Sequence, residues 1–189
     1  MTKIKTLFLV EVAVFTALAL LLDLIPLQIK LWPQGGSIDF AMIPIFIVAF
    51  RWGLKGGLLS GFLWGMLQIA VGTAYVMVPL QGFIDYAIAF TVIGLAGVVA
   101  KAVQKNVREN KIKSYLFLIT LGVFIGSFAR FIAHYIAGIV FFGSAVEGQP
   151  AWLYSLLYNG SYMLPSFILS ALAVFFLFHK QPKTLLQSK

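Results

Sequence analysis

Long apolar segments, separated by short polar or basic segments, follow one another along the whole chain. A helix needs about 20 mostly apolar residues to cross a bilayer, and several of these segments reach that length. We therefore predict an all-α integral membrane fold with six transmembrane helices, in which residues 1–189 form a single membrane-embedded domain. The predicted segments are residues 7–22, 38–50, 58–72, 81–100, 114–142 and 152–178.

The stretch before the second segment breaks the apolar pattern. Residues 27–37 (LQIKLWPQGGS) combine one Pro with two Gly, a composition that favours turns and irregular loops. In the next segment, Pro44 would remove a helical hydrogen bond from the middle of residues 38–50. Irregular backbone is tolerated in a membrane only where protein or water satisfies it. We therefore predict an irregular first outer loop that folds over a cavity.

A basic turn and a row of glycines mark the start of the third segment. Arg51 and Lys55 predict a short turn on the inner side of the membrane. Gly57, Gly61 and Gly65 then recur every four residues, so they lie on one face of a helix. Because glycine has no side chain, this face predicts close packing against a neighbouring helix.

The composition agrees with a membrane location. Hydrophobic residues make up 61% of the chain and charged residues only 11%, and the mean hydropathy is +0.97. These values lie far outside the range of soluble globular domains. Because nearly the whole chain is predicted to lie in the membrane, any binding site must lie within the membrane fold itself. The chain also has no cysteine, which excludes disulfides and thiolate chemistry.

The distribution of lysine and arginine along the chain predicts which segments lie on the cytoplasmic side. The net charge is +8, which on a soluble protein would suggest a nucleic-acid partner. Here the lysines and arginines form short runs between apolar segments. All except Lys30 and Arg130 lie near the N-terminus, in the basic turn, in residues 101–113 or near the C-terminus. Loops rich in Lys and Arg stay on the cytoplasmic side. We therefore predict cytoplasmic N- and C-termini and no nucleic-acid partner.

Polar residues within the apolar segments point to a site. Arg130, His134, Gly138 and Phe142 follow one another at four-residue steps and would form one stripe on a helix. A charge at bilayer depth is costly, so such residues usually face a protein interior or a wet cavity. Asp85 is the second unusual residue, and the topology places it in the same outer half as Trp32, Tyr75, Tyr154 and Asn159.

One carboxylate, one imidazole, one amide and many aromatic rings suit a particular kind of ligand. Stacking, hydrogen bonds and cation–π contacts from such a set would hold a flat, nitrogen-bearing and cationic molecule. Each residue also has a purely structural explanation. Arg130 would neutralise Asp85 or Glu11, and His134 alone would be a hydrogen-bonded packing residue. Their common depth in the membrane favours a site.

The sequence contains few features that would support an enzymatic function. The chain contains no HExxH or GxSxG motif and no second carboxylate near Asp85 in sequence. A GxxxxGK[ST] phosphate loop is also missing, so the chain does not hydrolyse ATP by that route. We therefore predict neither catalytic activity nor a metal or cofactor.

Four motifs together resemble a known family. WPQGGSI, QGFIDYAIAF, HYIAGIVFFGSA and YSLLYNGSY are similar to segments of the thiamine-binding S component of energy-coupling factor (ECF) transporters. The resemblance covers nearly the whole chain. It implies a six-helix substrate-binding subunit of the bacterial cytoplasmic membrane, surrounded by lipid. Its implied partners are a transmembrane coupling subunit and two cytoplasmic ATPases.

The resemblance also implies roles for individual residues. Asp85 matches the acid that pairs with the aminopyrimidine of thiamine, although some members carry Glu there. Phe142 stands where some members have Trp. Tyr154 and Asn159 lie five residues apart, about 140° around a regular helix, so both would reach one ligand only if Tyr154 lies at an irregular helix start. The full set of candidate ligand-lining residues is Trp32, Trp64, Tyr75, Asp85, Tyr86, His134, Gly138, Phe142, Tyr154 and Asn159.

A pair of small residues on the first helix is a candidate interface. Ala13 and Ala17 lie four residues apart, which allows another helix to approach closely. From the spacing alone, internal packing and partner docking are equally compatible with this pair. The resemblance favours docking of the coupling subunit.

Three alternatives to thiamine capture stay open. A proton-coupled secondary carrier would use Asp85, His134 and Arg130 as a relay. An intramembrane enzyme would use His134 with Asp85. An S component for a related vitamin or for a thiamine precursor would share the fold and most of the site.

Overall fold

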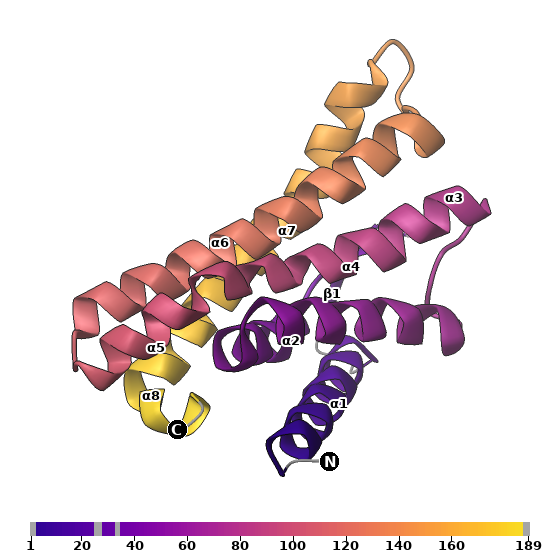
Figure 1. Cartoon of the computed structure of the whole chain (residues 1–189). Coiled ribbons are helices and arrows are strands. Elements are labelled where there is room, and N and C mark those ends of the chain that lie inside the picture. The colour runs from indigo at the N-terminus through magenta and orange to yellow at the C-terminus, as the bar shows by residue number, and fades with distance from the viewer. Residues whose placement is uncertain (1–2, 25–27, 33–34, 187–189) are drawn as a thin grey trace.

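The computed structural model describes residues 3–24, 28–32 and 35–186, and these are mostly helical. Five helices in these ranges are long and apolar enough to cross a membrane (Figure 1). The elements in order are α1 (Lys3–Leu24), β1 (Ile29–Trp32), β2 (Gly35–Ile38), α2 (Met42–Ala70), α3 (Pro79–Gly82), η1 (Phe83–Ile88), α4 (Ala89–Thr91), η2 (Val92–Val99), α5 (Ala100–Arg108), α6 (Ile112–Ala137), η3 (Gly138–Phe142), α7 (Ala151–Lys180) and α8 (Pro182–Leu185).

Helix α2 consists of two arms, which accounts for the predicted second and third segments. Gly53 has φ 74° and ψ −165°, a left-handed conformation that glycine adopts without a steric penalty. The break lies between Arg51 and Lys55, where the sequence predicts the inner turn. With the two arms counted separately, the described ranges contain the six membrane helices that we predicted.

The row of glycines packs as predicted. A Cβ atom at Gly61 or Gly65 would overlap the carbonyl oxygen of Phe90 or Tyr86. The second arm of α2 therefore touches the backbone of the following helix directly. This contact fixes the depth at which η1, and with it Asp85, lies in the bundle.

The fourth membrane helix changes its winding along its length. Residues 79–108 form one continuous helical rod, but η1 is a π-helical segment and η2 is a 3₁₀ segment. A second π-helical segment, η3, ends the fifth membrane helix. Because α5 reaches Arg108, the basic connection predicted at residues 101–113 is mostly helical, and only a short turn follows it.

The predicted irregular outer loop contains a regular hairpin. Strands β1 and β2 pair antiparallel, with Ile29 opposite Ile38 and Trp32 opposite Gly35. Because Ile38 belongs to β2, α2 begins only at Met42 and not at residue 38. Pro44 therefore lies in the first helical turn, where backbone N–H groups have no helical acceptor, and the hydrogen bond that we expected Pro44 to remove is not lost.

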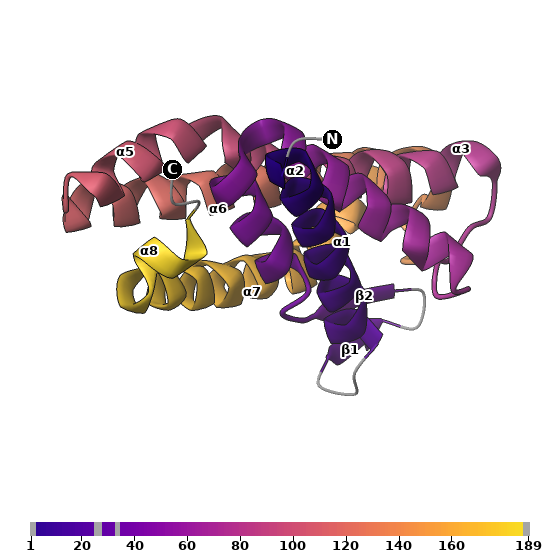
Figure 2. The same cartoon turned by 60° about the horizontal axis from the view of Figure 1, so that its bottom comes forward.

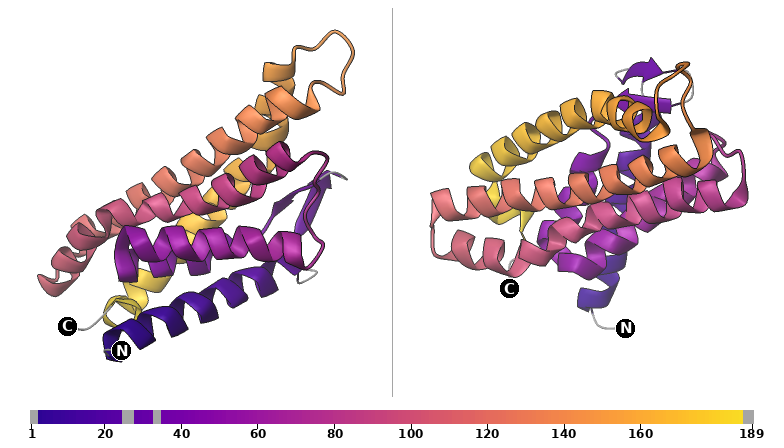
Figure 3. Two further views of the ribbon diagram at one scale, coloured as in Figure 1. Left: turned by 45° about the vertical axis from the view of Figure 1, so that its right-hand side comes forward. Right: turned by 90° about the horizontal axis from the view of Figure 1, so that it is seen from above.

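The connections separate into two ends of the bundle. Both termini and the turn between α5 and α6 lie at one end, whereas the hairpin, residues 71–78 and residues 143–150 lie at the other (Figure 3). We call these the inner end and the outer end, and their orientation in the membrane remains a prediction from the charge distribution.

Helix α1 is the most peripheral membrane helix. It packs against α2 (Figure 2). Thr16 Oγ1 lies 2.8 Å from Ser60 Oγ across that contact. Ala13 and Ala17 are exposed on another face of α1, so they do not pack inside this chain. The core instead centres on the first arm of α2, where Ile45, Phe46 and Phe50 are fully buried.

Candidate functional site

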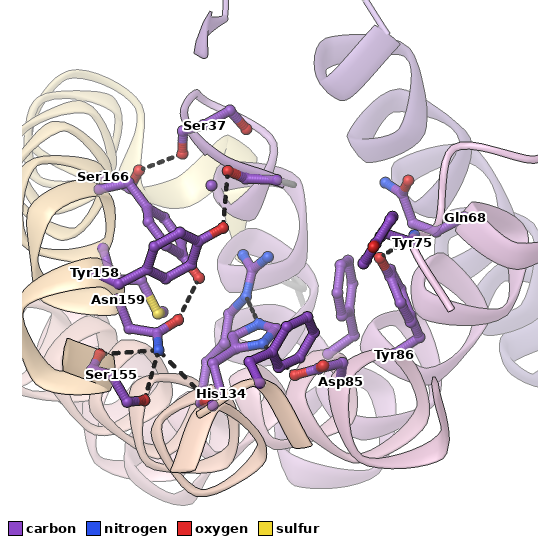
Figure 4. Close-up of a pocket in the computed structure, with 18 of the residues that line it drawn as sticks. Ser37, Gln68, Tyr75, Asp85, Tyr86, His134, Ser155, Tyr158, Asn159 and Ser166 are labelled. Carbon is purple, nitrogen blue, oxygen red and sulfur yellow. Dashed lines mark hydrogen bonds and ion pairs between the residues drawn. The ribbon is translucent and has the colours of Figure 1, made fainter. Parts of the chain in front are cut away.

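A cavity of about 280 Å³ opens among α2, η1, α6, η3, α7 and the hairpin, toward the outer end. This volume is close to the lower end of the range of about 300–1,000 Å³ that is typical of small-molecule sites. Figure 4 shows His134 and Asp85 on its floor, and Tyr158, Asn159 and Ser155 reaching in from α7. Candidate residues on its wall are Tyr75, Asp85, Tyr86, His134, Gly138, Phe142, Tyr154 and Asn159.

Asp85 is the acidic group on the cavity floor. It belongs to η1 and is only 8% exposed. His134 Nδ1 lies 2.8 Å from Asp85 Oδ1, and Gln81 Nε2 donates a 2.6 Å hydrogen bond to Oδ2. Each carboxylate oxygen has two lone pairs, so both oxygens keep acceptor capacity for a ligand.

Gln81 is a residue that our sequence reasoning missed. It is 1% exposed, and besides Asp85 it binds the carbonyl oxygen of Tyr75 (3.1 Å) and accepts a hydrogen bond from Met77 N–H (2.9 Å). The hydroxyl of Tyr86 accepts a 2.6 Å bond from Tyr75 N–H. These contacts attach residues 71–78 to the helix that carries Asp85. The sequence feature that could have identified Gln81 is its amide side chain, which lies one helical turn before the membrane-embedded Asp85.

The predicted stripe on α6 and η3 lies along one wall. Arg130, His134, Gly138 and Phe142 all line the cavity. Gly138 leaves room for α7, since a Cβ atom there would overlap Ser155 Oγ. At the mouth, the Phe142 ring lies 6.3 Å from the Tyr75 ring at an interplanar angle of 30°.

Helix α7 supplies the opposite wall through two adjacent columns of residues. Asn159 donates to the Ser155 carbonyl (3.0 Å), and its Oδ1 accepts from the Tyr162 hydroxyl (2.7 Å). The Tyr154 and Tyr158 rings stack at 6.0 Å in the neighbouring column. The expected irregular helix start is absent, because α7 is regular from Ala151. Tyr154 and Asn159 nevertheless both line the cavity, since the tyrosine column flanks the asparagine column.

The structure places two candidates behind the wall and not on it. Trp64 is 1% exposed and packs edge-on against Phe90 at 4.5 Å. Trp32, on the outer hairpin, lies 5.4 Å from the Tyr158 ring, and its Nε1 donates to Ser161 Oγ at 2.9 Å. Each therefore touches residues that line the cavity without lining it itself.

Arg130 has different partners from those we expected. Its Nε donates to His134 Nε2 at 3.3 Å, and its guanidinium carbon lies 4.5 Å from the Phe90 ring centre. Within the described residues it makes no ion pair with Asp85 or Glu11. Glu11 pairs instead with Arg51 at the inner end.

A second polar group at the cavity edge was also missed. Asp23, at the end of α1, lines the cavity and accepts a hydrogen bond from Gln68 Nε2. Gln68 in turn accepts from the Thr73 hydroxyl. Asp39 lines the cavity from the segment after β2, and its Oδ1 accepts from Ala41 N–H at 2.9 Å. With three carboxylates and the one guanidinium of Arg130, the described wall favours a cationic ligand.

Comparison with known proteins agrees with this picture. A family model described as thiamine transporter protein (Thia_YuaJ) matches residues 9–186. The chain is 44% identical over 182 residues to the thiamine transporter ThiT of Bacillus subtilis, covering 96% of this chain and 95% of that protein. It is 38% identical over 171 residues to ThiT of Lacticaseibacillus paracasei, covering 87% and 83% respectively.

A solved structure supports the same relationship. ThiT from Listeria monocytogenes superposes with a TM-score of 0.89 at 35% sequence identity, covering 97% of this chain and 99% of that chain. The family consists of transporters, which removes the intramembrane enzyme from the alternatives. With its five long apolar helices, the protein is a multi-pass protein of the cytoplasmic membrane. The family model and both relatives cover most of the chain, which therefore belongs to the thiamine transporter protein family.

Proposed function

We propose that this chain captures thiamine in the outer-end cavity and is the substrate-binding subunit of an ECF-type transporter. All 189 residues would then serve as one membrane-embedded binding domain. The observation that carries the proposal is Asp85, a nearly buried carboxylate that contacts the Gln81 amide and the His134 imidazole in a cavity lined with aromatic rings. It offers a charged acceptor to a ligand that brings hydrogen-bond donors and a positive charge.

The two halves of thiamine match the two sides of the cavity. The aminopyrimidine presents an exocyclic amino group, which would donate a hydrogen bond to the Asp85 carboxylate beside the rings of Tyr86 and Tyr75. The thiazolium ring is a cation, and the faces of Tyr154 and Phe142 would stabilise it by cation–π contact. His134, Gly138 and Asn159 complete this proposed site. Trp64 and Trp32 would act on the ligand only through the residues they touch.

Capture alone does not supply energy for uptake. The chain has no phosphate loop, so we propose that a transmembrane coupling subunit and two cytoplasmic ATPases drive transport. Ala13 and Ala17 are exposed on the peripheral helix α1, and α2 does not cover them. Two small residues one turn apart let another helix approach closely, so this face is the proposed docking surface.

Titration of the purified protein with thiamine, followed by tryptophan fluorescence, tests the proposal. The matched ligand is the thiamine analogue in which oxygen replaces the exocyclic amino group. We expect saturable binding of thiamine and binding of the analogue weaker by about 1–3 kcal/mol, since Asp85 would lose a hydrogen-bond donor. Equal affinity for both would reject the role of Asp85. Tighter binding of the free aminopyrimidine half would favour a precursor as the natural substrate.

The docking face is tested separately. Ala13→Trp and Ala17→Trp should leave thiamine affinity near normal, because both residues lie outside the cavity wall. Both variants should fail to co-purify with the coupling subunit and should not support uptake in cells. Leu172→Trp is the matched control, since Leu172 is 51% exposed on α7 and lies outside the proposed face. Normal ATP-dependent uptake by both alanine variants would rule out docking at this face.

A proton-coupled carrier is the second candidate, because His134 and Asp85 form a hydrogen-bonded pair of groups that can exchange a proton, beside the fixed positive charge of Arg130. Such a pair is what a proton relay requires. Uptake into vesicles that contain only this protein decides between the two. Accumulation driven by a proton gradient would establish the carrier, and a strict need for the ATPases would establish the ECF-type subunit.

A further inference from the structure

The two ring nitrogens of His134 have different partners. Nδ1 faces Asp85 Oδ1 at 2.8 Å, and Nε2 faces Arg130 Nε at 3.3 Å. An arginine Nε–H group can only donate, because the guanidinium has no acceptor and stays charged in proteins. Nε2 must therefore be the acceptor. In the neutral ring the proton then sits on Nδ1, which donates to the carboxylate of Asp85.

Arg130 is itself held in place by aromatic rings. Its guanidinium carbon lies 4.5 Å from the centre of Phe90 and 5.3 Å from that of Trp64. Trp64 is fully buried and packs edge-on against Phe90, so neither ring can move far. A guanidinium is attracted to the faces of such rings, which keeps its Nε–H aimed at His134. Trp64 thus connects to the site through Arg130.

We infer that Arg130, clamped by Phe90 and Trp64, is a positioning residue that fixes His134 as the tautomer that carries its proton on Nδ1. In that state His134 gives Asp85 a neutral hydrogen bond. The imidazole also separates the guanidinium from the carboxylate, so the negative charge of Asp85 is not consumed by an internal ion pair. This role deepens the proposed thiamine site, on which it rests.

The opposite tautomer would damage the site. A proton on Nε2 would point at the guanidinium, and the lone pair of Nδ1 would face the Asp85 oxygen. Both contacts would be repulsive, so the ring would have to turn and Oδ1 would lose its donor. Asp85 would then be held by Gln81 alone. Arg130 therefore decides how the carboxylate is presented, without itself touching it.

Nitrogen-15 NMR of labelled histidine reads the tautomer directly at neutral pH. The chain has two histidines, and a His179→Gln background leaves only the His134 signals. We expect the neutral, Nδ1-protonated pattern with Arg130 present, and loss of that pattern in Arg130→Met. Arg130→Lys should recover part of it, since lysine donates a hydrogen bond but lacks the planar guanidinium.

Thiamine affinity is measured on the same proteins. Arg130→Met should weaken binding by about tenfold or more, as expected for a polar partner left unsupported in a buried site. Arg108→Met is the matched control, because Arg108 is exposed on α5 at the inner end and should change neither the tautomer nor the affinity. If Arg130→Met does not fold, Trp64→Leu removes half of the aromatic clamp and should shift the tautomer in the same direction.

Three results would overturn the inference. The first is a proton on Nε2 of His134 in the unmodified protein. The second is an unchanged Nδ1-protonated pattern in folded Arg130→Met. If Arg130→Met does not fold, the third is an unchanged pattern in Trp64→Leu. Failure of the unmodified protein to bind thiamine would reject the proposed ligand instead. The NMR pattern, which needs no ligand, would still decide the role of Arg130.

Discussion

Arg51 and Arg130 are both half-buried in the membrane fold, and their surroundings differ. At the inner end, Arg51 donates two hydrogen bonds to the Glu11 carboxylate, of 2.5 Å from Nε and 2.7 Å from Nη2. Trp52 Nε1 donates to the same carboxylate at 2.6 Å, and Arg51 Nη1 reaches the Thr184 carbonyl at 3.2 Å. Both charges are thereby neutralised within the protein.

At the outer end the charges are kept apart. Arg130 meets a neutral imidazole and two aromatic rings, and Asp85 meets the same imidazole and the Gln81 amide. A bidentate ion pair satisfies most of the hydrogen-bonding capacity of its partners and leaves little for a ligand. A carboxylate held only by neutral donors keeps its charge and several lone pairs. This difference supports the proposal that Asp85 binds the ligand, whereas the inner pair stabilises the fold.

The position of the inner pair supports this interpretation. It joins α1 to the break in α2, where helical hydrogen bonding is interrupted at Gly53. Gln104 of α5 donates to the carbonyls of Phe50 and Arg51 at 2.9 and 3.0 Å, which satisfies part of the freed backbone. The pair therefore stabilises a junction of three helices.

The largest expected contrast between the two ends is in chemical labelling. The native chain has no cysteine, so single cysteines can be introduced without background. Glu147→Cys, between η3 and α7, should react with a membrane-impermeant reagent added to intact cells, and Asn106→Cys in α5 should react only after permeabilisation. The opposite pattern would invert the predicted orientation and place the cavity on the cytoplasmic side.

The next largest effect is expected at Asp85. Asp85→Asn should weaken thiamine binding by about 2–5 kcal/mol, because an amide cannot supply the charge that pairs with the ligand cation. Glu11→Gln changes the other acid in the same way and should leave the dissociation constant unaltered. Titration calorimetry of both purified variants makes the comparison. Equal losses would show that the two acids do not differ in function.

Breaking the inner pair should affect stability and not binding. Arg51→Met leaves the Glu11 carboxylate without its bidentate partner, and we expect a loss of about 1.5–3 kcal/mol in unfolding free energy. Unfolding in detergent and thiamine titration would be measured on the same sample. Glu11→Gln/Arg51→Met should recover part of the loss, since no lone charge remains. A selective loss of affinity would instead connect the inner end to the site.

The smallest effect is expected at the hairpin. Ser161→Ala removes the acceptor of the Trp32 indole and should shorten the lifetime of bound thiamine by about two- to tenfold, the effect of one partly exposed hydrogen bond. Ser170→Ala on the same helix is the control, because Ser170 lies outside the cavity wall and its hydroxyl has no hydrogen-bond partner among the described residues. Stopped-flow dissociation measures both. Identical lifetimes would show that the hairpin does not retain the ligand.

Much of the architecture follows from local sequence. The lengths of the apolar segments predicted the membrane helices, and the glycine row at Gly57, Gly61 and Gly65 predicted a close backbone contact. Helical periodicity alone placed Arg130, His134, Gly138 and Phe142 on one wall. These predictions succeed because a membrane leaves the backbone few alternatives to a helix, and four-residue spacing then determines which side chains share a face.

Long-range contacts decided the rest. The hairpin, the π-helical segments at Asp85 and Gly138, and the position of Pro44 in a first turn depend on how the elements pack and not on propensity. Gln81 and Asp23 acquire importance only from the partners that the fold brings to them.

Within the site, some features were predictable from the sequence and others depend on the tertiary structure. The sequence predicted that the Asp85 carboxylate and the His134 imidazole would share one half of a membrane bundle, with the Arg130 guanidinium on the same helix face as His134, because of their spacing along helices and the asymmetry of basic residues. Only the tertiary structure decided that Arg130 bonds His134 instead of Asp85, and that Trp64 holds Arg130 instead of lining the cavity. Hydrogen-bond partners depend on distances and angles between helices, and the order of residues in one helix does not contain them.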